Sequence, residues 1–429
     1  MQLIKYPKPQ HLNALLQRPA TDILSTSKDV AAILENVKAN GDEALKKYAQ
    51  QFDKVKLTKL LVSEKEITAA TDEVDVKLKK AIQVAFSNIK KFHKAQQLET
   101  KKIETTKGVV CWRESRPIEN VGLYIPGGTA PLFSTVLMLA IPASIAGCKN
   151  INLCSPPDKN GKIHPAILFA AKLCGVHKIY KVGGAQAIAA MAYGTKTVIK
   201  SDKIFGPGNR YVTAAKQLVQ QNGVAIDMPA GPSEVMVIGD ESCVPEFIAA
   251  DLLSQAEHGI DSQVIFVTWK ESLIKKALQQ VEEQAQQLPR REIALQALKH
   301  SKIILVKNKQ EVVSIINTYA PEHLILAVKD ETYFMRNVIN AGSVFIGNYT
   351  PESAGDYASG TNHTLPTNGY ARVYGGVSLD SFVKKITYQK ISPAGLKNIG
   401  NVIEVMAEAE ELHAHKNAVS VRLRKLNSK

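Results

Sequence analysis

Residues 178–194 read KIYKVGGAQAIAAMAYG, and this stretch shows the pattern that decides the fold. A short β-branched and aromatic run ends in two glycines, and an alanine-rich helical run follows at once. Strands that alternate with helices in this way predict a parallel sheet that is covered by helices. The same succession occurs in VGLYIPGG (121–128) before a helix from Ala130, in INLCSPP (151–157) before AILFAAKLCG (166–175), and in KIFGPGN (203–209) before RYVTAAKQLVQQ (210–221).

A second series of this kind starts at residue 234. We therefore predict an α/β protein with two Rossmann-like parallel-sheet domains and small helical N- and C-terminal segments. Its strand-like runs are EVMVIGD (234–240), SQVIFVTW (262–269), KIILV (302–306) and LILAV (324–328), and its helical runs are 245–257, a long one before Pro289, and EVVSIINTYA (311–320).

The domain organisation follows from these two series. Residues 21–107 show helical spacing, as in Val30, Ile33, Leu34 and Val37, and the chain turns helical again from residue 381. The expected parts are an N-terminal arm (1–20), a discontinuous α/β domain (21–120 and 233–380), a nucleotide-binding-like α/β domain (121–232) and a helical tail (381–429).

Composition limits the class of protein. The 429 residues are 45% hydrophobic and 22% charged, which is typical of a globular protein with more than one core. The longest apolar stretch, 131–147, is interrupted by Pro142 and is too short to predict a membrane span. The start, MQLIKYPKPQHL, does not have the pattern of a secretion signal. We expect a cytoplasmic protein.

The cysteines and the net charge exclude few classes of protein. The five cysteines form no C-x-x-C pair, and so we expect reduced thiols and no disulfide framework. The net charge of +14 would favour an anionic partner such as nucleic acid. However, the lysines are spread along the chain and few aromatic residues lie among them. Nucleic-acid binding stays an alternative of a different class, and a steep salt dependence would reveal it.

Three glycine turns are candidates for phosphate binding. At the end of a parallel strand, glycines let backbone N–H groups approach a phosphate, helped by the dipole of the next helix. The usual G-x-G-x-x-G fingerprint and its acidic ribose partner are absent from the sequence. Tight turns without a ligand explain the glycines about equally well. The turns are Gly127-Gly128, Gly183-Gly184 and Gly206-Pro207-Gly208.

Several side chains are competent to bind a metal ion. A mixture of imidazole and oxygen ligands suits a borderline divalent ion such as zinc. Taken singly, each histidine is more often a surface or core residue than a ligand. Glu410 and His415 can serve one metal site only if the helix breaks between them. The candidates are Gln255 and His258 near a helix end, Asp356 and His363 in the loop PESAGDYASGTNH, and Glu410 and His415.

The tripeptide Pro321-Glu322-His323 places a carboxylate beside an imidazole. Neighbouring side chains diverge along a chain, so this is no hydrogen-bonded dyad, but an acid and a base could reach different atoms of one substrate. A helix start explains the same residues, since Pro and Glu are common in a first turn. Taken alone, the tripeptide favours the helix start.

Together these segments closely resemble the histidinol dehydrogenase family. The first hundred residues match only loosely, ARVYGGV (371–377) is more variable, and Ile260 and Arg210-Tyr211 depart from the common pattern. The matching stretches follow the order of the family: VGLYIPGGTAPLFSTVLMLAIPA, VGGAQAIAA, KIFGPGN, AIDMPAGPSEV, DLLSQAEHG, APEHL, AGSVFIGNYTPESAGDYASGTNHTLPT and AHKNAVSVR.

The resemblance implies a reaction and a partner. The reaction is the zinc-dependent, four-electron oxidation of L-histidinol to L-histidine via L-histidinal with two NAD, the last step of histidine biosynthesis. The partner is a second copy of the chain, whose C-terminal tail reaches into the site, and neither nucleic acid nor a membrane is implied. A dehydrogenase of a related amino alcohol is the nearest alternative, and a zinc hydrolase is a more distant one.

The resemblance also implies a role for each site residue. The residues that carry over are Glu322 and His323 as acid–base residues; Gln255, His258, Asp356 and His415 as zinc ligands; Tyr124, Gln186 and Asn209 as NAD contacts; and Ser233, His363 and Glu410 as histidinol contacts alongside His323 and the zinc ligands.

Overall fold

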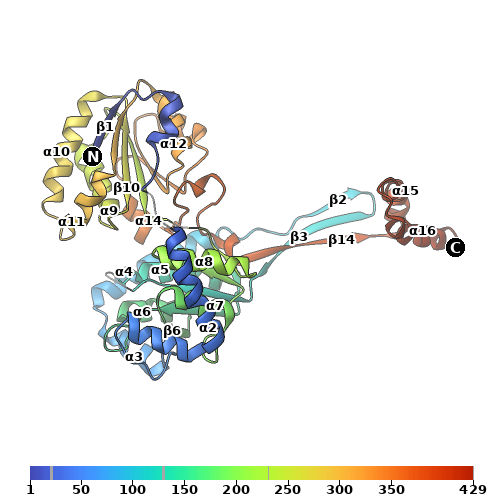
Figure 1. The fold of residues 1–429 in the computed structure, drawn as a ribbon. Coiled ribbons are helices and arrows are strands. Elements are labelled where there is room, and N and C mark those ends of the chain that lie inside the picture. The colour runs from blue at the N-terminus through green and yellow to red at the C-terminus, as the bar shows by residue number, and fades with distance from the viewer. Residues whose placement is uncertain (20–22, 128–130, 230, 429) are drawn as a thin grey trace. The chain divides into compact units, whose positions relative to one another are not determined.

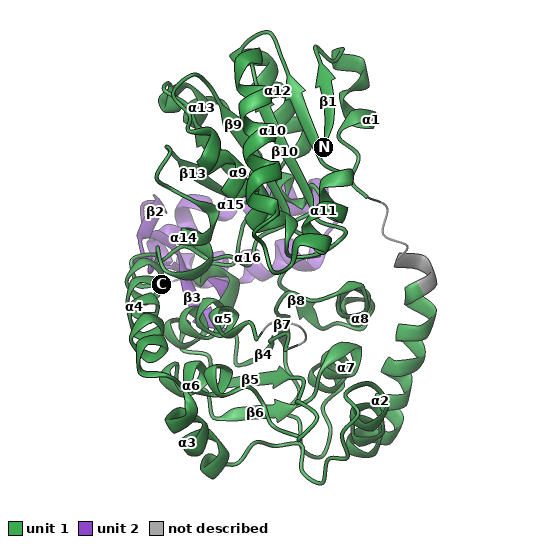
Figure 2. Ribbon diagram, turned by 90° about the vertical axis from the view of Figure 1, so that its left-hand side faces the viewer, with its two compact units in different colours: residues 1–96, 118–382 green, residues 97–117, 383–429 purple. Residues whose placement is uncertain are grey.

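The computed structural model describes residues 1–19, 23–127, 131–229 and 231–428, and the chain divides into two compact units. Unit 1 comprises residues 1–96 and 118–382, and unit 2 comprises residues 97–117 and 383–429 (Figure 2). Unit 1 contains two parallel sheets, sheet A and sheet B, whereas unit 2 contains an antiparallel sheet, sheet C. The predicted boundary between residues 20 and 21 lies outside the described residues.

Sheet A has six parallel strands in the order β1-β11-β10-β9-β12-β13. The N-terminal arm therefore contributes an edge strand to this sheet. The strands are β1 (Gln2–Lys5), β9 (Glu234–Gly239), β10 (Gln263–Thr268), β11 (Lys302–Leu305), β12 (His323–Ala327) and β13 (Ser343–Ile346).

Helices cover both faces of sheet A because its strands are apolar on both sides. Val235 and Val237 of β9 pack with α9, α10 and α11, whereas Met236 and Ile238 pack with α1, α12 and α13. Figure 1 shows α9, α10 and α11 on one side of the sheet and α12 on the other. The helices are α1 (Leu12–Leu15), α9 (Pro245–Ala256), α10 (Glu271–Ala285), α11 (Arg291–Lys299), α12 (Lys309–Tyr319) and α13 (Glu331–Asn337).

Sheet B has five parallel strands in the order β6-β5-β4-β7-β8. Helices α3 to α6 pack on one face, and α2, α7 and α8 pack on the other. The strands are β4 (Asn120–Tyr124), β5 (Asn150–Ser155), β6 (Lys178–Lys181), β7 (Lys203–Phe205) and β8 (Ala225–Ile226), and the helices are α2 (Ile23–Phe52), α3 (Glu64–Glu73), α4 (Val76–Lys94), α5 (Phe133–Ala146), α6 (Pro165–Leu173), α7 (Gly184–Tyr193) and α8 (Arg210–Gln221).

The two parallel sheets share one winding pattern. In each, the next two strands extend to one side of the first strand and the following two extend to the other side, as β6-β5-β4-β7-β8 and β11-β10-β9-β12-β13 show. This confirms the predicted pair of Rossmann-like sheets. In such sheets ligands commonly bind at the carboxyl ends of the strands, where the winding reverses. The reversal lies between β4 and β7 in sheet B and between β9 and β12 in sheet A.

The packing of residues 23–94 differs from the predicted grouping. These residues were expected to belong with 233–380, but α2, α3 and α4 bury their apolar faces against α5 to α8 of sheet B. Val30 and Ile89, for example, are fully buried in the two clusters beside that sheet. An amphipathic stripe shows that a helix is covered but not what covers it, which is why the sequence pattern misplaced these helices.

Unit 2 corrects a second expectation. Residues 97–107 and the chain from 381 were expected to be helical, but sheet C has the order β14-β3-β2 and is antiparallel. Its strands pair residues such as Val383 and Pro117, which lie far apart in sequence. The elements of unit 2 are β2 (Lys102–Thr106), β3 (Val109–Pro117), β14 (Val383–Ile391), α15 (Pro393–Ala409) and α16 (His413–Asn427).

Two further features of the described residues bear on the expectations. No helix there is long and apolar enough to cross a bilayer. The five cysteines are free thiols, of which four are buried and Cys111 is partly exposed. The remaining short elements of unit 1 are α14 (Glu352–Tyr357) and the 3-10 turns η1 (Pro9–His11), η2 (Tyr370–Arg372) and η3 (Leu379–Phe382).

Candidate functional site

Glu322 and His323 lie at the amino end of β12, beside the amino end of the neighbouring strand β9 of sheet A. Glu234 begins β9, and His323 begins β12 beside it. The Glu234 N–H donates to Glu322 Oε2 at 2.9 Å, and its carbonyl oxygen lies 3.1 Å from His323 Nδ1. The predicted helix start at Pro321 is therefore wrong. The tripeptide leads into a strand, and the backbone N–H and C=O of one residue, Glu234 of β9, hold the two side chains.

The tautomer of His323 follows from this contact. A carbonyl oxygen can only accept a hydrogen bond, so Nδ1 carries the proton and donates to Glu234. In the neutral ring, Nε2 is then the atom that can accept a proton. Nε2 is buried, has no hydrogen-bond partner among the described residues, and lies 3.7 Å from Asp356 Oδ1.

Three carboxylates surround this imidazole. Nδ1 lies 3.6 Å from Glu322 Oε2 and 3.8 Å from Glu352 Oε1, and Asp356 faces the other ring nitrogen. Burial lowers the pKa of His323, but the negative charges of Glu352, Glu322 and Asp356 outweigh burial and raise it to about 10. A histidine that accepts a proton from a substrate must first be neutral. A further positive charge beside these carboxylates would shift His323 toward that form.

The carboxylates themselves differ in charge state. Burial raises the pKa of Glu322 to about 8 and that of Glu352 to about 8, although His323 acts in the opposite direction. For Asp356, burial also raises the pKa, but the interaction with His323 outweighs it and the pKa is lowered overall. A buried group of acids that is rich in negative charge is typical of cation sites.

His258, Glu352 and Asp356 could hold a metal ion together. One ligand atom from each lies within 4.8 Å of the others. Gln255 adjoins them. When its side-chain amide is oriented with the nitrogen toward Glu352, it donates to Glu352 Oε1 and its oxygen accepts from the Glu234 N–H at 2.8 Å. Glu352 Oε2 is buried without a hydrogen-bond partner in the described chain. Imidazole and oxygen donors with an unpaired buried atom fit a borderline divalent ion such as zinc.

Glu352 is the residue of this cluster that sequence reasoning missed. It lies in the unusual loop that supplied Asp356 and His363, and it precedes Asp356 by four residues. That spacing puts both carboxylates on one face of α14, and this was the available signal. The loop drew attention through its later residues, and its first acid was not assigned.

His363 and Ser233 lie near the same edge. His363 Nδ1 donates to the Asp356 carbonyl oxygen at 2.9 Å, and Nε2 lies 3.0 Å from Thr135 Oγ1 of α5. Asn362 donates to the Met138 carbonyl oxygen at 2.6 Å, so α5 of the sheet B layer fixes this loop. Ser233 immediately precedes Glu234, and its carbonyl oxygen accepts from Gln263 N–H at 3.2 Å.

Glu410 and His415 belong to unit 2. Helix α15 ends at Ala409 and α16 begins at His413, so the helix breaks between the two residues, which was the condition for both to serve one site. Glu411 has a φ of 58° in that break. Both Glu410 and His415 are exposed on this unit, as a residue that meets another surface would be.

Tyr124, Gln186 and Asn209 gather at the carboxyl edge of sheet B, where its winding reverses. The Tyr124 hydroxyl accepts from the Gly184 N–H at 3.0 Å, and Gln186 is buried in the first turn of the same helix. Asn209 caps α8 and accepts from Tyr211 N–H at 3.0 Å. Of the three predicted cofactor residues, Tyr124 ends β4, whereas Gln186 lies in α7 after β6 and Asn209 lies in the turn after β7.

The Gly206-Pro207-Gly208 turn is fixed from two sides. Gly206 has a φ of 128°, and a Cβ there would overlap the carbonyl oxygen of Tyr124. Asp227 Oδ2 accepts from the Gly206 N–H at 2.8 Å, and Lys216 Nζ donates to the Gly206 carbonyl oxygen at 3.0 Å. Lys216 and Asp227 also form an ion pair, with side chains only 4% and 1% exposed.

The other two glycine turns have a packing reason. A Cβ at Gly127 or at Gly183 would press on Pro156, which leaves no room for a side chain. For these two positions close packing against Pro156 accounts for the glycine. Gly128 lies outside the described residues.

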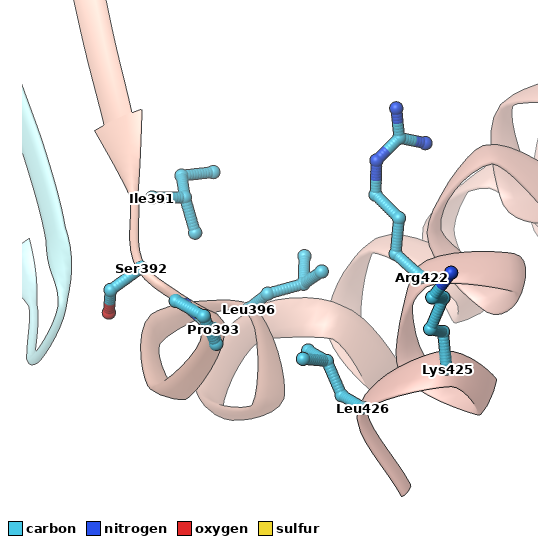
Figure 3. Close-up of a pocket in the computed structure, with 7 residues that line it drawn as sticks. All are labelled: Ile391, Ser392, Pro393, Leu396, Arg422, Lys425 and Leu426. Atoms are coloured by element: carbon cyan, nitrogen blue, oxygen red, sulfur yellow. The ribbon is translucent and has the colours of Figure 1, made fainter. Parts of the chain in front are cut away.

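A pocket of about 420 Å³ lies in unit 2, away from any predicted site residue (Figure 3). Its wall is mostly apolar, and Arg422 and Lys425 stand at its rim. It contains no acid or histidine that could move a proton. Its lining residues are Ile391, Ser392, Pro393, Leu396, Arg422, Lys425 and Leu426.

Two doubly wound sheets, one with a nucleotide-type carboxyl edge and one with a buried acid–imidazole cluster, define a two-lobed α/β enzyme. A family model described as histidinol dehydrogenase matches residues 16–423. A histidinol dehydrogenase of Bacteroides fragilis is 60% identical over 99% of this chain and 100% of its own length. That of Escherichia coli K12 is 53% identical over 96% and 95% of the two chains.

The comparison with solved structures agrees. A crystal structure of histidinol dehydrogenase from Elizabethkingia anophelis superposes with a TM-score of 0.98 at 59% identity, covering 100% of this chain and 99% of that one. The chain belongs to the histidinol dehydrogenase family and is an oxidoreductase. The resemblance found in its sequence motifs is thereby confirmed.

Proposed function

We propose that this enzyme oxidises L-histidinol to L-histidine through L-histidinal, with zinc and two NAD, as the last step of histidine biosynthesis in the cytoplasm. The observation that carries the proposal is the attachment of Glu322 and His323 to the backbone of one residue, Glu234, beside the donor group of His258, Glu352 and Asp356. An acid, a base and a cation site at one edge are what a two-step oxidation of an amino alcohol requires.

Zinc would be held by Gln255, His258 and Asp356 of one chain and His415 of the partner's tail. When bound, it supplies a positive charge that orients the imidazole and amine of histidinol and offsets the neighbouring carboxylates. Glu352 contacts Gln255 and lies with His258 and Asp356, so it belongs to the same set. Ser233, His363 and Glu410 would contact the substrate.

His323 would act as the base in the first oxidation. Its Nδ1 is engaged with Glu234, and so Nε2 receives the hydroxyl proton as hydride leaves the adjacent carbon. The position of the ring is fixed by strand pairing between β9 and β12, which keeps the base at one place through the reaction.

Glu322 would activate water in the second oxidation. The aldehyde must be hydrated before it can lose a second hydride, and a carboxylate can take a proton from the attacking water. Glu322 accepts one backbone hydrogen bond and is buried, so its raised pKa makes it a better base than an exposed glutamate. Burial of the site would also keep the aldehyde from escaping.

NAD would bind at the carboxyl edge of sheet B and supply the hydride acceptor. Tyr124, Gln186 and Asn209 lie at or shortly after the ends of three strands there, and α7 and α8 begin at the same edge. Helix starts present N–H groups of the kind that bind phosphate oxygens. The winding reversal between β4 and β7 supports this position.

We further propose that the enzyme is a homodimer in which each tail completes the site of the other copy. Exposed Glu410 and His415, separated by a helix break, are suited to that role. On this proposal a monomer has an incomplete metal site.

The test is NADH formation by zinc-loaded protein with L-histidinol and NAD, beside a chelator-treated sample. Two NADH per histidinol, lost with the metal and regained on adding zinc, is the expected result. Dimeric, zinc-bound protein that forms no NADH from histidinol would refute the proposal, and related amino alcohols would then be the substrates to try.

A further inference from the structure

Arg18 of the N-terminal arm makes a two-pronged contact with Glu234. Its Nε and Nη2 donate to the two carboxylate oxygens, the latter at 2.8 Å, and Nη2 also donates to the Tyr319 carbonyl oxygen at 2.8 Å. The guanidinium carbon lies 3.9 Å from the centre of the Tyr319 ring. The side chains of Arg18 and Glu234 are 16% and 3% exposed, so this pair is shielded from water. Such bidentate, shielded pairs fix geometry strongly.

Glu234 connects this pair to the chemistry. Its side chain binds Arg18, while its backbone N–H and carbonyl hold Glu322 and His323. Among the described residues, Glu234 is the one whose backbone hydrogen-bonds both side chains. Any shift of the Glu234 backbone therefore moves the proposed acid and base together.

The same carboxylate also holds the end of the site loop. The Asn368 N–H donates to Glu234 Oε1 at 2.7 Å, and Thr367 Oγ1 accepts from the Gly231 N–H. This loop carries His363 a few residues earlier. Arg18 thus neutralises the Glu234 carboxylate, which belongs to the first residue of β9 and also accepts a hydrogen bond from the loop.

Without Arg18, Glu234 would be a buried carboxylate lacking a counter-charge. Such a charge is strongly unfavourable, and the side chain would turn toward water or toward the N–H groups near it. Turning the side chain displaces the backbone on which Glu322 and His323 depend. Small displacements of catalytic groups cost much activity because reactive geometry is narrow.

We propose that Arg18 is a positioning residue for Glu322 and His323, acting through Glu234. The role rests on the proposed function. It gives the N-terminal arm, which otherwise adds an edge strand and the short helix α1 to the sheet A layer, a part in the reaction.

The test compares Arg18→Met and Arg18→Lys with the wild type in NADH assays with zinc and histidinol. We expect Arg18→Met to lower kcat about 10- to 100-fold while the KM for NAD changes less than about twofold. Arg18→Lys keeps the charge without the fork and should lose less. The matched control is Lys309→Met: Lys309 also pairs with a carboxylate, Asp330 at 2.7 Å, and lies over a tyrosine ring in the same layer. That variant should keep wild-type kcat.

A double variant separates positioning from folding. In a Glu234→Gln background no buried charge needs Arg18, so adding Arg18→Met should lower kcat by less than about threefold. An equal loss in both backgrounds would mean that Arg18 does not act through Glu234. If Arg18→Met kept the wild-type kcat and only lowered the melting temperature, the N-terminal arm would have a structural role alone. If Arg18→Met does not fold, Arg18→Lys takes its place in the cycle.

An activity-independent measurement distinguishes failure of this role from failure of the proposed function. The His323 Nδ1–H should give a slowly exchanging ring proton in nitrogen-15 NMR, assigned by its absence in His323→Ala. Faster exchange in Arg18→Met, but not in Lys309→Met, supports the positioning role even if histidinol is not the substrate. Unchanged exchange would overturn it, whatever the wild type oxidises.

Discussion

Lys216 and Asp227 form a buried ion pair that holds the backbone of Gly206: Asp227 accepts from its N–H, and Lys216 donates to its carbonyl oxygen. Lys216→Met leaves a buried carboxylate unpaired, so the free energy of unfolding should fall by about 3–5 kcal/mol in denaturant titration. The turn should also loosen and raise the KM for NAD severalfold, with the KM for histidinol unchanged.

The control for this variant is Lys46→Met in α2. Lys46 pairs with Glu43 at 2.9 Å on the surface of the same layer, and an exposed pair contributes little. Neither unfolding nor the KM for NAD should change. An unaltered KM for NAD in Lys216→Met would mean that the Gly206 turn does not contact the cofactor.

Glu322 and His323 should separate the two oxidations. His323→Ala removes the base for the alcohol and should slow that step about 10²- to 10⁴-fold, while added L-histidinal is still converted. Glu322→Gln should chiefly impair conversion of the aldehyde, because the amide cannot take a proton from water. Stopped-flow NADH traces from histidinol and from histidinal measure the two steps. Full histidine formation at the wild-type rate in Glu322→Gln would show that another group activates the water.

Asp53 should make the stability of the protein depend on pH. Burial raises the pKa of Asp53 to about 6, and Oδ2 has no partner among the described residues. The folded state therefore binds this proton more tightly than the unfolded state, whose pKa is near 3.8. The stability contributed by the protonated form is fully present below about pH 3.8 and is lost as the pH rises to about 6.

Asp53→Asn removes the ionised form altogether. It should raise the free energy of unfolding by about 1–2 kcal/mol at pH 7.5, after allowance for partial exposure, and by much less at pH 4. Thermal unfolding at the two pH values measures the difference. A gain that is equal at both pH values would assign the effect to packing instead of charge.

The proposed exchange of tails predicts complementation. His323→Ala and His415→Ala should each be inactive, but a hybrid dimer would have one site with a normal core and a normal tail. Mixing the two variants under conditions that exchange subunits should restore up to about a quarter of wild-type activity, since about half of the dimers are hybrids. No recovery in verified hybrids would place His415 in the site of its own chain.

The sequence predicted both parallel sheets because each strand is followed at once by its turn and helix. The runs around Gly183 and Gly206 contain the strand, the turn and the helix within about twenty residues, so local pattern was enough. Sheet C was missed for the opposite reason. Its strands pair residues far apart in the sequence, such as Val383 and Pro117, and most of their residues are exposed. Neither a neighbouring partner strand in the sequence nor an alternation of apolar and polar residues therefore indicated a strand.

The candidate site was predictable in its members but not in its arrangement. Motif resemblance selected Glu322, His323 and Asp356, and the structure brings these three together. The common attachment of Glu322 and His323 to Glu234 depends on strand pairing across about ninety residues, which no local spacing reveals. Arg18 could not be inferred for the same reason, because its partner lies 216 positions away.

The unequal exposure of the cysteines makes the native sequence convenient for spectroscopy. Burial raises the pKa of four thiols, those of Cys148, Cys154, Cys174 and Cys243. Maleimides react with the thiolate form, so these four cysteines will react slowly. Cys111 on β3 is partly exposed. A fluorophore or spin label would therefore attach to sheet C alone, and this unit could be observed separately from the rest without replacing a single residue.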